Sequence, residues 1–543
     1  MKSINDIAAQ IGLDPRAIEP YGHYMAKVPL EIFPKGNRRG KLILVTGINP
    51  TPAGEGKTTV SVGLTEGLGK LGDQVIVTLR EPSLGPVFGI KGGGTGGGRA
   101  TILPEEEINL HFTGDMHAVA STHNLLAALV DNAVYRGDIE GFEPSGVEWR
   151  RVTDASDRGL RQVITGLGGS ANSPLRESGF SIIAASEVMA ILALASDWDD
   201  LRVRLSRIVV GLTKDGNPVT VEDLKITGAL VSLMRHAIKP NLVQTVEGQT
   251  AVVHAGPFGN IAHGCSSVLA DRLALGCAEY VVTEAGFGAD LGFEKFMHIK
   301  ARFNDLEPSA VVIVATVRAL KWHGGLSIRE LGEEDESALQ LGFANLEHMI
   351  GLVGRFGLPA VVAINRFPGD TEDEISLLRR LSLAAGARGV AEVNAFQKGG
   401  EGSIELAEVV KGVATDSPNV SYLYSEDDSI EDKVASLARN VYAADGVVWN
   451  PVAKRRLRKF ESLGWGSLPI CMAKTHLSLS HDPALKGRPS GYDFQISDVR
   501  VSTGAGFVFP LAGRIETLPG LPSKPRALDI DVDNSGNVRG LMG

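Results

Sequence analysis

The residues best suited to chemistry stand in a glycine-bearing loop between an expected strand and an expected helix. The stretch reads ILVTGINPTPAGEGKTTVSVGLTEGLGKLG, from Ile43 to Gly72. It resembles the phosphate-binding pattern G-x-x-x-x-G-K-[ST], except that Thr51 stands where the first glycine belongs. Such a loop holds phosphate oxygens with backbone amides and a helix N-terminus, while a lysine and a hydroxyl supply a cation and an Mg²⁺ ligand.

The residue types of this loop suggest individual roles. The backbone from Ala53 to Lys57 can supply amides, and Gly54 and Gly56 allow the chain to approach a ligand closely. Lys57 is the expected cation, and the Thr58 hydroxyl is the expected Mg²⁺ ligand. The alternative is a tight turn with a solvated lysine. The order of strand, loop, lysine, threonine and helix favours phosphate binding.

A second candidate follows in TLREPSLGP, where Arg80 and Glu81 stand at the end of the next expected strand. In a parallel sheet this strand end is expected to lie beside the phosphate loop. An arginine there can hold an anionic acyl or phosphoryl group with two parallel hydrogen bonds. Glu81 could act on a metal or a proton. The alternative is an arginine–glutamate pair on the surface.

Other chemistry-bearing residues give weaker signals. His111 and His117 lie six residues apart without a third ligand, so we expect buried, hydrogen-bonded histidines rather than a zinc site. The same interpretation applies to His254 and His263 in VHAGPFGNIAHGCSS. The glycine tract GIKGGGTGGGRA is either a further anion-accepting loop or a mobile surface loop. Aromatic residues in two later loops could sandwich a flat ring, although each alone is more often part of a core; they are Phe367 and Phe396.

Composition excludes several classes of protein. The chain has 543 residues and a net charge of −10, which argues against nucleic acid as a partner. Its three cysteines, without C-x-x-C spacing, are typical of reduced thiols in a cytoplasmic protein. The start MKSINDIAAQIGLD has no apolar segment of a secretory signal. The apolar stretch 181–195 is too short for a membrane span and contains Glu187, so we expect a buried helix there and no membrane association.

The expected elements alternate between strands and helices. Short β-branched runs predict buried strands at 41–48, 252–256, 280–286, 310–317 and 359–365. Helical stretches between them predict an α/β protein with a P-loop NTPase-like core and a mainly parallel sheet flanked by helices. We expect three parts: a nucleotide-binding domain over 1–350, a second α/β domain over 351–470 and a small lobe over 471–543. Residues 1–40 are expected to be polar and helical.

Many segments together carry a resemblance to a known family. They are TPAGEGKTT, REPSLGPVFGIKGG, LHFTGDMHA, AIKPNLVQTVEGQTAVVHAGPFGNIAHGCSS, TEAGFGADLGFEKF, ATVRALKWHGG, KGGEGS and GAGFVFP with LPGLPSKP. In this order, and from end to end, the chain resembles formate–tetrahydrofolate ligase. The resemblance implies that ATP, formate and tetrahydrofolate are converted to ADP, phosphate and 10-formyltetrahydrofolate through formyl phosphate.

The resemblance also implies functional residues and cofactors. The family's ATP loop matches Thr51, Pro52, Ala53, Gly54, Glu55, Gly56, Lys57 and Thr58. The arginine that holds formyl phosphate in the family matches Arg80, with Glu81 beside it. Phe287 matches a phenylalanine of the family that is expected near the one-carbon site. Phe367 and Phe396 match two aromatics that sandwich a pterin or adenine ring, although the second is usually tryptophan. The family's HGCNS reads HGCSS here, with Ser266 in place of asparagine. Further implications are Mg²⁺, a monovalent cation (K⁺ or NH₄⁺), polyglutamylated tetrahydrofolate as substrate, a homotetramer and a monofunctional enzyme.

Two other classes of function fit the phosphate loop alone. The chain could be a P-loop ATPase or kinase that acts on another carboxylate or on a partner protein, or a nucleotide-binding scaffold without catalysis. ADP release that requires both formate and tetrahydrofolate indicates the ligase. ATP turnover independent of both indicates an ATPase, and ATP binding without turnover indicates a scaffold.

Overall fold

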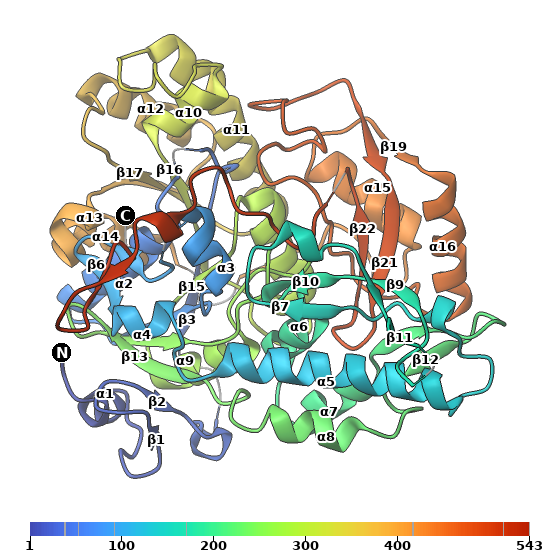
Figure 1. Cartoon of the computed structure of the whole chain (residues 1–543). Helices are drawn as coiled ribbons and strands as arrows, with labels where there is room; N and C mark the ends of the chain where they lie inside the picture. Colours follow the sequence, from blue (N-terminus) through green and yellow to red (C-terminus); the bar gives the residue numbers. More distant parts are fainter. Residues whose placement is uncertain are drawn as a thin grey trace.

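A large mixed sheet forms the centre of the protein (Figure 1). The computed structural model describes residues 1–36, 40–52, 54–91, 93–169, 171–414, 418–513 and 515–541. Seven neighbouring strands of the sheet run parallel to one another. In spatial order they are β14 (Thr250–Val253), β4 (Val75–Leu79), β15 (Tyr280–Glu284), β3 (Lys41–Gly47), β16 (Ala310–Ala315), β17 (Ala360–Asn365) and β18 (Gly389–Val393). The predicted mixed α/β fold with a mainly parallel sheet is confirmed.

One edge of the sheet is antiparallel and was not predicted. Strand β13 (Asn241–Thr245) pairs antiparallel with β14, and short strands continue the edge beyond it. These are β1 (Glu19–Pro20), β2 (Ala26–Lys27), β5 (Gly96–Gly97) and β6 (Ala100–Leu103). Two or four residues carry too little alternation to predict a strand, so these pairings depend on contacts between distant parts of the chain.

Alternate side chains of the parallel strands pack into two different hydrophobic cores, one on each face of the sheet. Ile43 and Val45 pack with side chains of α2 (Lys57–Lys70) and α14 (Ile404–Val413). Leu42 and Leu44 point to the opposite face and pack with helices that cover it. Those helices include α9 (Val268–Cys277), α10 (Val317–His323), α11 (Glu336–Arg355) and α12 (Glu372–Ala384). Since successive side chains of a strand point to opposite faces, a strand covered by helices on both sides is apolar on both faces, as β3 is from Leu42 to Val45.

Glycines in α2 let this helix lie unusually close to the segment that follows β18. A Cβ at Gly63 would lie 2.4 Å from the Ala395 Cβ, and one at Gly67 would lie 2.8 Å from the Ser403 carbonyl oxygen. Ala395 begins the short helix α13 (Ala395–Lys398). The helix after the glycine loop is thereby held against α13, which carries Phe396.

The buried carboxyl of Glu66 in α2 gives a prediction about stability. Burial, and then the neighbouring charge of Glu247, raise the pKa of Glu66 from 4.5 to about 8. The folded chain therefore binds more protons than the unfolded chain between these two values, and stability falls as pH rises through this window. We expect Glu66→Gln to raise the melting temperature by a few degrees at pH 8 and by less at pH 6. Thermal unfolding at both pH values checks this, with the exposed-site variant Glu408→Gln as control. An equal effect at both values would contradict it.

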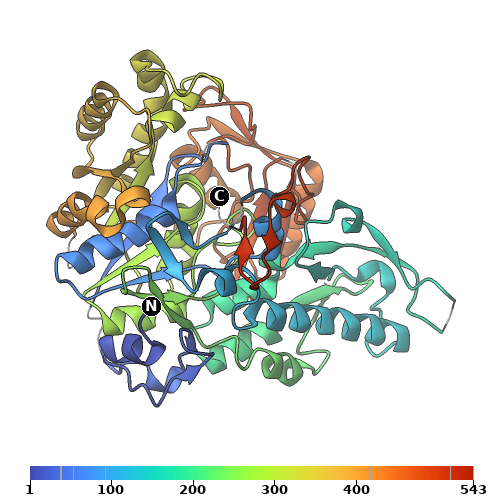
Figure 2. The ribbon, with the colours of Figure 1, turned by 60° about the vertical axis from the view of Figure 1, so that its left-hand side comes forward.

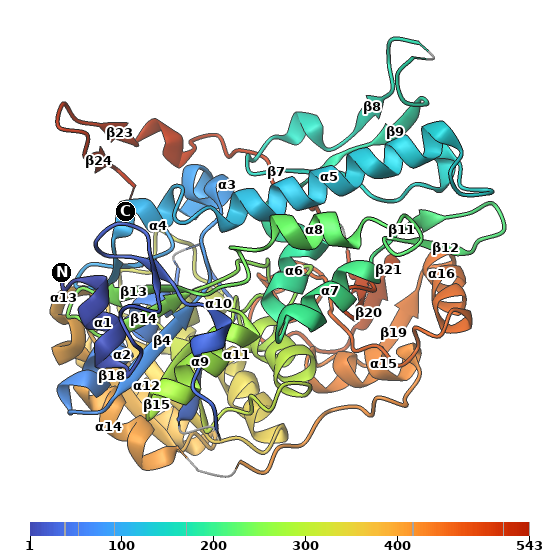
Figure 3. The same ribbon diagram turned by 90° about the horizontal axis from the view of Figure 1, so that it is seen from below.

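A helical lobe packs beside the sheet (Figure 3). Its helices are α5 (Asp115–Arg136), α6 (Glu187–Leu194), α7 (Trp198–Ser206) and α8 (Thr227–Leu233). Small pairings accompany them, formed by β7 (Arg151–Thr153), β8 (Val163–Thr165), β9 (Arg176–Ser178), β10 (Phe180–Ile182), β11 (Val209–Leu212) and β12 (Pro218–Thr220). The helix predicted within 181–195 is confirmed as α6, where every residue after Glu187 is buried. Within the described residues, no helix is long and apolar enough to cross a membrane.

The C-terminal part packs against both the sheet and the helical lobe. It contains α15 (Ile430–Asn440), α16 (Pro451–Ser462), β19 (Gly446–Trp449), β20 (Asp493–Ile496), β21 (Asp498–Ser502) and β22 (Phe507–Leu511). The last strands, β23 (Asp531–Val532) and β24 (Val538–Arg539), return to the N-terminal half, where the Val538 amide donates to Glu106 (Figure 2). Strand β19 precedes the predicted domain boundary at residue 470 and pairs with β20, which follows it. The division of the chain into domains at residues 350 and 470 stays a prediction.

The helical prediction for residues 1–40 is wrong for most of the segment. Only α1 (Ile4–Gln10) is an α-helix; turns, β1, β2 and a single 3₁₀ turn (Leu30–Ile32) follow it among the described residues. Pro15, Pro20, Pro29 and Pro34 remove backbone donors and fix φ, so no long helix can form. The polar composition of the segment reflects a surface position rather than helical periodicity.

Candidate active site

The glycine loop joins the carboxyl end of β3 to the start of α2. Gly56 precedes the helix with a φ of 73°, and a Cβ there would lie 2.5 Å from the side-chain nitrogen of Asn365. That nitrogen donates to the Glu55 carbonyl oxygen at 2.9 Å, and the Glu55 carboxylate accepts from the Thr51 amide at 2.7 Å. These contacts fix the loop, so its first position does not depend on glycine. Asn365 was not predicted. The predicted residue Ala53 lies outside the described residues.

Lys57 begins α2 and turns back toward the strand. A Cβ at Gly47 would lie 3.2 Å from Cδ of Lys57, which places the lysine stem along the end of β3. The next residue, Thr58, donates its hydroxyl to Oε2 of Glu284 at 2.8 Å. Hydroxyl and carboxylate oxygens are the ligands that Mg²⁺ prefers. Thr58 and Glu284 therefore fit a magnesium site, and Glu284 was missed by the sequence prediction.

Strand order differs from the expectation that placed Arg80 directly beside the loop. Strand β15 lies between β3 and β4, so Arg80 follows a strand that is two positions from β3. Glu284, the last residue of β15, lies between Arg80 and Thr58 and contacts both. Its Oε1 lies 3.7 Å from Arg80, and its Oε2 accepts from Thr58. The order is set by long-range pairing, because β15 follows β4 by about two hundred residues of chain.

Backbone groups lie close to the guanidinium of Arg80. Its Nη1 donates to the Pro257 carbonyl oxygen at 3.3 Å, and a Cβ at Gly286 would lie 3.2 Å from both terminal nitrogens. The side chain remains 27% exposed. Arg80 is thus fixed at one side by Glu284 and Pro257 and is accessible to a ligand at the other.

Glu81 has different neighbours from Arg80. Its amide donates to the Ala255 carbonyl oxygen at 2.8 Å, and its side chain is 5% exposed. Burial raises the pKa of this carboxyl well above its ordinary value, the charge of Asp115 raises it further, and Lys27 opposes both. Lys27 and Asp115 themselves form an ion pair of 2.5 Å. The catalytic role of Glu81 stays a prediction.

The three predicted aromatic residues lie in segments that follow strands of the sheet: Phe287 and Phe367 on loops, and Phe396 in the short helix α13. Phe287 follows β15 with a φ of 60° and stacks on His476 at 4.6 Å between ring centroids. Phe367 follows β17, and the guanidinium carbon of Arg318 lies 3.4 Å from its ring centroid. Phe396 follows β18 and is 53% exposed. His476 was not predicted, because it comes from a loop almost two hundred residues further along the chain.

The glycine tract packs against Phe396. A Cβ at Gly98 would lie 2.1 Å from the Phe396 carbonyl oxygen, which also accepts from the Arg99 amide at 2.9 Å. Gly98 itself has a φ of 60°. The described part of the tract therefore supports α13, the short helix that carries Phe396, through close backbone contacts at Gly98 that only glycine permits.

The histidine predictions are confirmed in part. His254 is buried between the Ser267 hydroxyl and the Ala237 carbonyl oxygen, and burial lowers its pKa to about 4. His111 and His117 are exposed, so the expectation that they are buried is wrong. His263 is fully buried, but neither of its ring nitrogens has a hydrogen-bond partner among the described residues.

Fold and site together define the class of this protein. It is a mixed α/β protein that gathers a glycine loop, two cationic side chains and a carboxylate at the carboxyl edge of a mainly parallel sheet, which is where such proteins bind ligands. The family model described as formate–tetrahydrofolate ligase matches residues 1–542. The chain belongs to the formate–tetrahydrofolate ligase family.

Named relatives support this assignment over the whole length. The formate–tetrahydrofolate ligase of Desulforamulus reducens is 53% identical, with 100% of this chain and 97% of the relative covered. The enzyme of the same name from Bacillus pumilus is also 53% identical, with 100% and 97% covered. That of Myxococcus xanthus is 51% identical, with 100% and 99% covered.

Proposed function

We infer that the chain ligates formate to tetrahydrofolate with ATP, giving 10-formyltetrahydrofolate, ADP and phosphate. Family membership over the full length supports this activity. The observation that carries it in the structure is the chain of contacts from Thr58 through Glu284 to Arg80. It joins a loop suited to nucleotide phosphates to an arginine suited to an acyl phosphate, so one site can transfer a phosphoryl group to formate.

The chemistry requires that formate be activated first. Formate is a poor electrophile because its carboxylate is charged and its oxygen is a poor leaving group. A formate oxygen attacks the γ-phosphorus of ATP, the bond to ADP breaks, and formyl phosphate forms. Lys57 and Arg80 neutralise the charge on the transferring group, which is the main way proteins accelerate phosphoryl transfer. Mg²⁺, when bound at Thr58 and Glu284, would neutralise further charge there.

The second step transfers the formyl group. N10 of tetrahydrofolate attacks the formyl carbon, the carbon–oxygen bond to phosphate breaks, and N10 loses a proton. Arg80 can hold the departing phosphate with two parallel hydrogen bonds. The mixed anhydride hydrolyses easily, so the site must exclude water between the two steps. Phe287 stacks on His476 and directly follows Gly286, whose backbone lies close to the Arg80 guanidinium. The ring pair therefore supplies an aromatic wall beside Arg80.

Further properties belong to the same proposal. The unit of β3, loop and α2 acts as a P-loop in which Thr51 replaces the first glycine and is fixed by Glu55. Thr51 to Thr58 bind ATP with Mg²⁺, and Glu81 takes part in catalysis. A monovalent cation, K⁺ or NH₄⁺, activates the enzyme. We further propose a cytoplasmic homotetramer that uses polyglutamylated tetrahydrofolate, on the basis of the family resemblance.

A coupled assay tests the activity directly. The purified chain is incubated with ATP, formate and tetrahydrofolate, and the product is read by absorbance after acid converts it to 5,10-methenyltetrahydrofolate. We expect product and ADP only when all three substrates are present. ADP release without formate and tetrahydrofolate would instead indicate an ATPase or a kinase. Folded protein that binds ATP and gives neither product would indicate a scaffold.

The Thr58–Glu284 contact predicts how the enzyme depends on Mg²⁺. Glu284→Gln keeps the size of the side chain and an acceptor for Thr58 but removes the charge. We expect the Mg²⁺ concentration for half-maximal activity to rise by about 10–100-fold, as for other residues that support a metal site. Initial rates against Mg²⁺ concentration check this, with Glu408→Gln on the exposed face of α14 as control. An unchanged Mg²⁺ curve would remove Glu284 from the site.

Because the ring of Phe396 is exposed, we expect it to stack on a flat substrate, and we predict that this substrate is tetrahydrofolate. Phe396→Ala should raise the KM for tetrahydrofolate by about tenfold, because aromatic stacking contributes about 0.5–1.5 kcal/mol beyond the burial of the ring. Phe396→Trp should keep the KM close to that of the native chain. Steady-state kinetics with each substrate varied distinguishes the alternatives. A rise in the KM for ATP alone would assign Phe396 to the adenine.

A further inference from the structure

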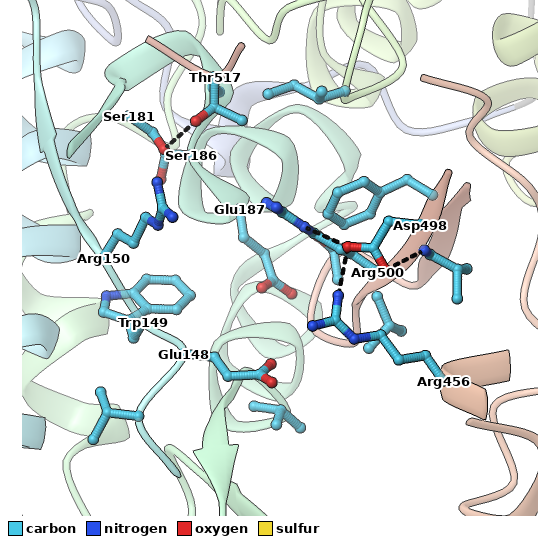
Figure 4. Close-up of a pocket in the computed structure, with 18 of the residues that line it drawn as sticks. Glu148, Trp149, Arg150, Ser181, Ser186, Glu187, Arg456, Asp498, Arg500 and Thr517 are labelled. Carbon is cyan, nitrogen blue, oxygen red and sulfur yellow. Dashed lines mark hydrogen bonds and ion pairs between the residues drawn. The ribbon is translucent and has the colours of Figure 1, made fainter. Parts of the chain in front are cut away.

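A cavity whose wall includes none of the residues assigned to ATP, formate and tetrahydrofolate is shown in Figure 4. Its volume is about 550 Å³, within the usual size range of small-molecule sites. Residues from 123–212 and from 456–517 form most of its wall, so it lies between the helical lobe and the C-terminal part. None of the predicted site residues lines it.

One wall of this cavity is aromatic and rigid. Trp149 is 7% exposed and stacks on His123 at 4.2 Å between ring centroids. The indole nitrogen donates to the His123 carbonyl oxygen at 3.2 Å, and Nδ1 of His123 lies 2.8 Å from the Ser186 hydroxyl. Burial lowers the pKa of His123 to about 3, so the ring is neutral. With buried Phe507, these rings give a preformed surface for carbon atoms of a ligand.

Arginines at the cavity exceed the carboxylates that pair with them. Arg456 and Arg500 share one partner, Asp498, at 2.5 and 3.9 Å. Arg150 reaches only the Arg161 carbonyl oxygen, at 3.5 Å, and no carboxylate lies within 4 Å of it among the described residues. These three guanidinium groups therefore pair with a single carboxylate, that of Asp498. A ligand carboxylate would supply the missing negative partner.

Glu187 presents the opposite charge in the same cavity. Its carboxyl points into the space between Trp149 and Asp498 (Figure 4). Oε1 accepts from the Gly504 and Ala505 amides at 2.8 and 3.3 Å, and no cation lies within 4 Å in the described part of the chain. Burial raises the pKa of Glu187 to about 7. A half-buried carboxylate that lacks a cation is unfavourable, so a ligand cation here would be stabilising.

We propose that this cavity binds a free α-amino acid, with its carboxylate at Arg150 and Arg500, its ammonium at Glu187 and its side chain against Trp149. A simple anion such as phosphate fits less well, because Glu187 and the rim residue Glu148 would repel it. A simple cation fits less well because of the arginines. Only a ligand with both charges satisfies both sets of groups.

Binding is tested first by titration of the full-length chain with each of the common amino acids, followed by thermal shift and calorimetry. We expect at least one to bind, and Glu187→Gln and Arg150→Gln each to weaken it at least about tenfold, as expected for a charged hydrogen bond. Glu187→Gln keeps an oxygen for the Gly504 amide, and normal ligase activity verifies its folding. Glu426→Gln should leave binding unchanged. The N-acetyl and the amide forms of the same amino acid should each lose binding.

Proton release gives a second, independent readout. A ligand ammonium favours the ionised form of Glu187 and lowers its pKa, so binding near pH 7 releases a proton. The charged groups that line the cavity with Glu187 are Glu148, Arg150, Arg176, Glu177, Arg456, Lys459, Asp498 and Arg500, and Arg204 donates to the neighbouring Ala505 carbonyl oxygen. Calorimetry in two buffers of different ionisation heat should show the release in the native chain and not in Glu187→Gln. Absence of binding by any amino acid, equal binding of the N-acetyl form or of phosphate, or unchanged binding in both variants would each overturn the proposal.

Discussion

Replacement of Arg80 by alanine is expected to lower kcat for 10-formyltetrahydrofolate synthesis by about 10²–10³-fold, the usual cost of removing one group that stabilises charge in the transition state. ATP binding should remain, because the loop from Thr51 to Thr58 does not depend on Arg80 for its fold. The arginine lies at Glu284 and Pro257, on the side of the site away from β3. Steady-state synthesis and ATP titration measure the two effects separately.

The matched control for this variant is Arg16→Ala. Arg16 is an exposed arginine that also pairs with one carboxylate, Asp14, so it tests the loss of an arginine without loss of the site. Synthesis should be unchanged in that variant. Unchanged synthesis in Arg80→Ala would show that Arg80 does not hold the acyl phosphate, and loss of ATP binding would place Arg80 in the nucleotide site instead.

Replacement of Lys57 by methionine is expected to act on the nucleotide itself. The lysine stem lies along the end of β3, and methionine keeps most of its apolar contacts with Gly47 while it removes the charge. We expect kcat/KM for ATP to fall by about 10²–10³-fold, because the cation acts on the phosphoryl group during transfer. Kinetics with ATP varied at saturating formate and tetrahydrofolate measure this change.

A control lysine distinguishes this effect from a general loss of charge. Lys214 is exposed and pairs with Glu143, so Lys214→Met should leave kcat/KM for ATP unchanged. If Lys57→Met lowered the affinity for tetrahydrofolate and left ATP kinetics unchanged, the phosphate-loop assignment would be wrong.

Local patterns in the sequence were sufficient to predict the central unit of the site. The buried strand at 41–47, the glycine loop and the helix from Lys57 are contiguous, so their order along the chain is also their order in space. Family resemblance explained Thr51, and the structure gives a physical reason: the Glu55 carboxylate fixes its amide. The parallel sheet followed from β-branched runs that are apolar on both faces.

Other parts of the site depend on contacts between distant segments. The insertion of β15 between β3 and β4 decides that Glu284, rather than Arg80, touches Thr58. Glu284 ends an apolar run, so it could have been predicted as an acidic residue at a strand end. Its contact with Thr58 could not have been predicted. His476 reaches the site from a loop with no motif of its own, and Asn365 ends the predicted strand 359–365, but its contact with the Glu55 carbonyl oxygen could not be predicted. The order of the strands and the packing of the loops fix the positions of these residues, and local sequence periodicity predicts neither.

The central claim is that ATP activates formate as formyl phosphate at the site formed by Lys57, Arg80 and Glu284. The most direct measurement uses formate labelled with ¹⁸O in both oxygens, followed by mass analysis of the phosphate released. If formate attacks the γ-phosphorus, one labelled oxygen stays with phosphorus when N10 displaces phosphate, so the phosphate carries one ¹⁸O for each product formed. Unlabelled phosphate, released at the same rate as 10-formyltetrahydrofolate, would contradict the account.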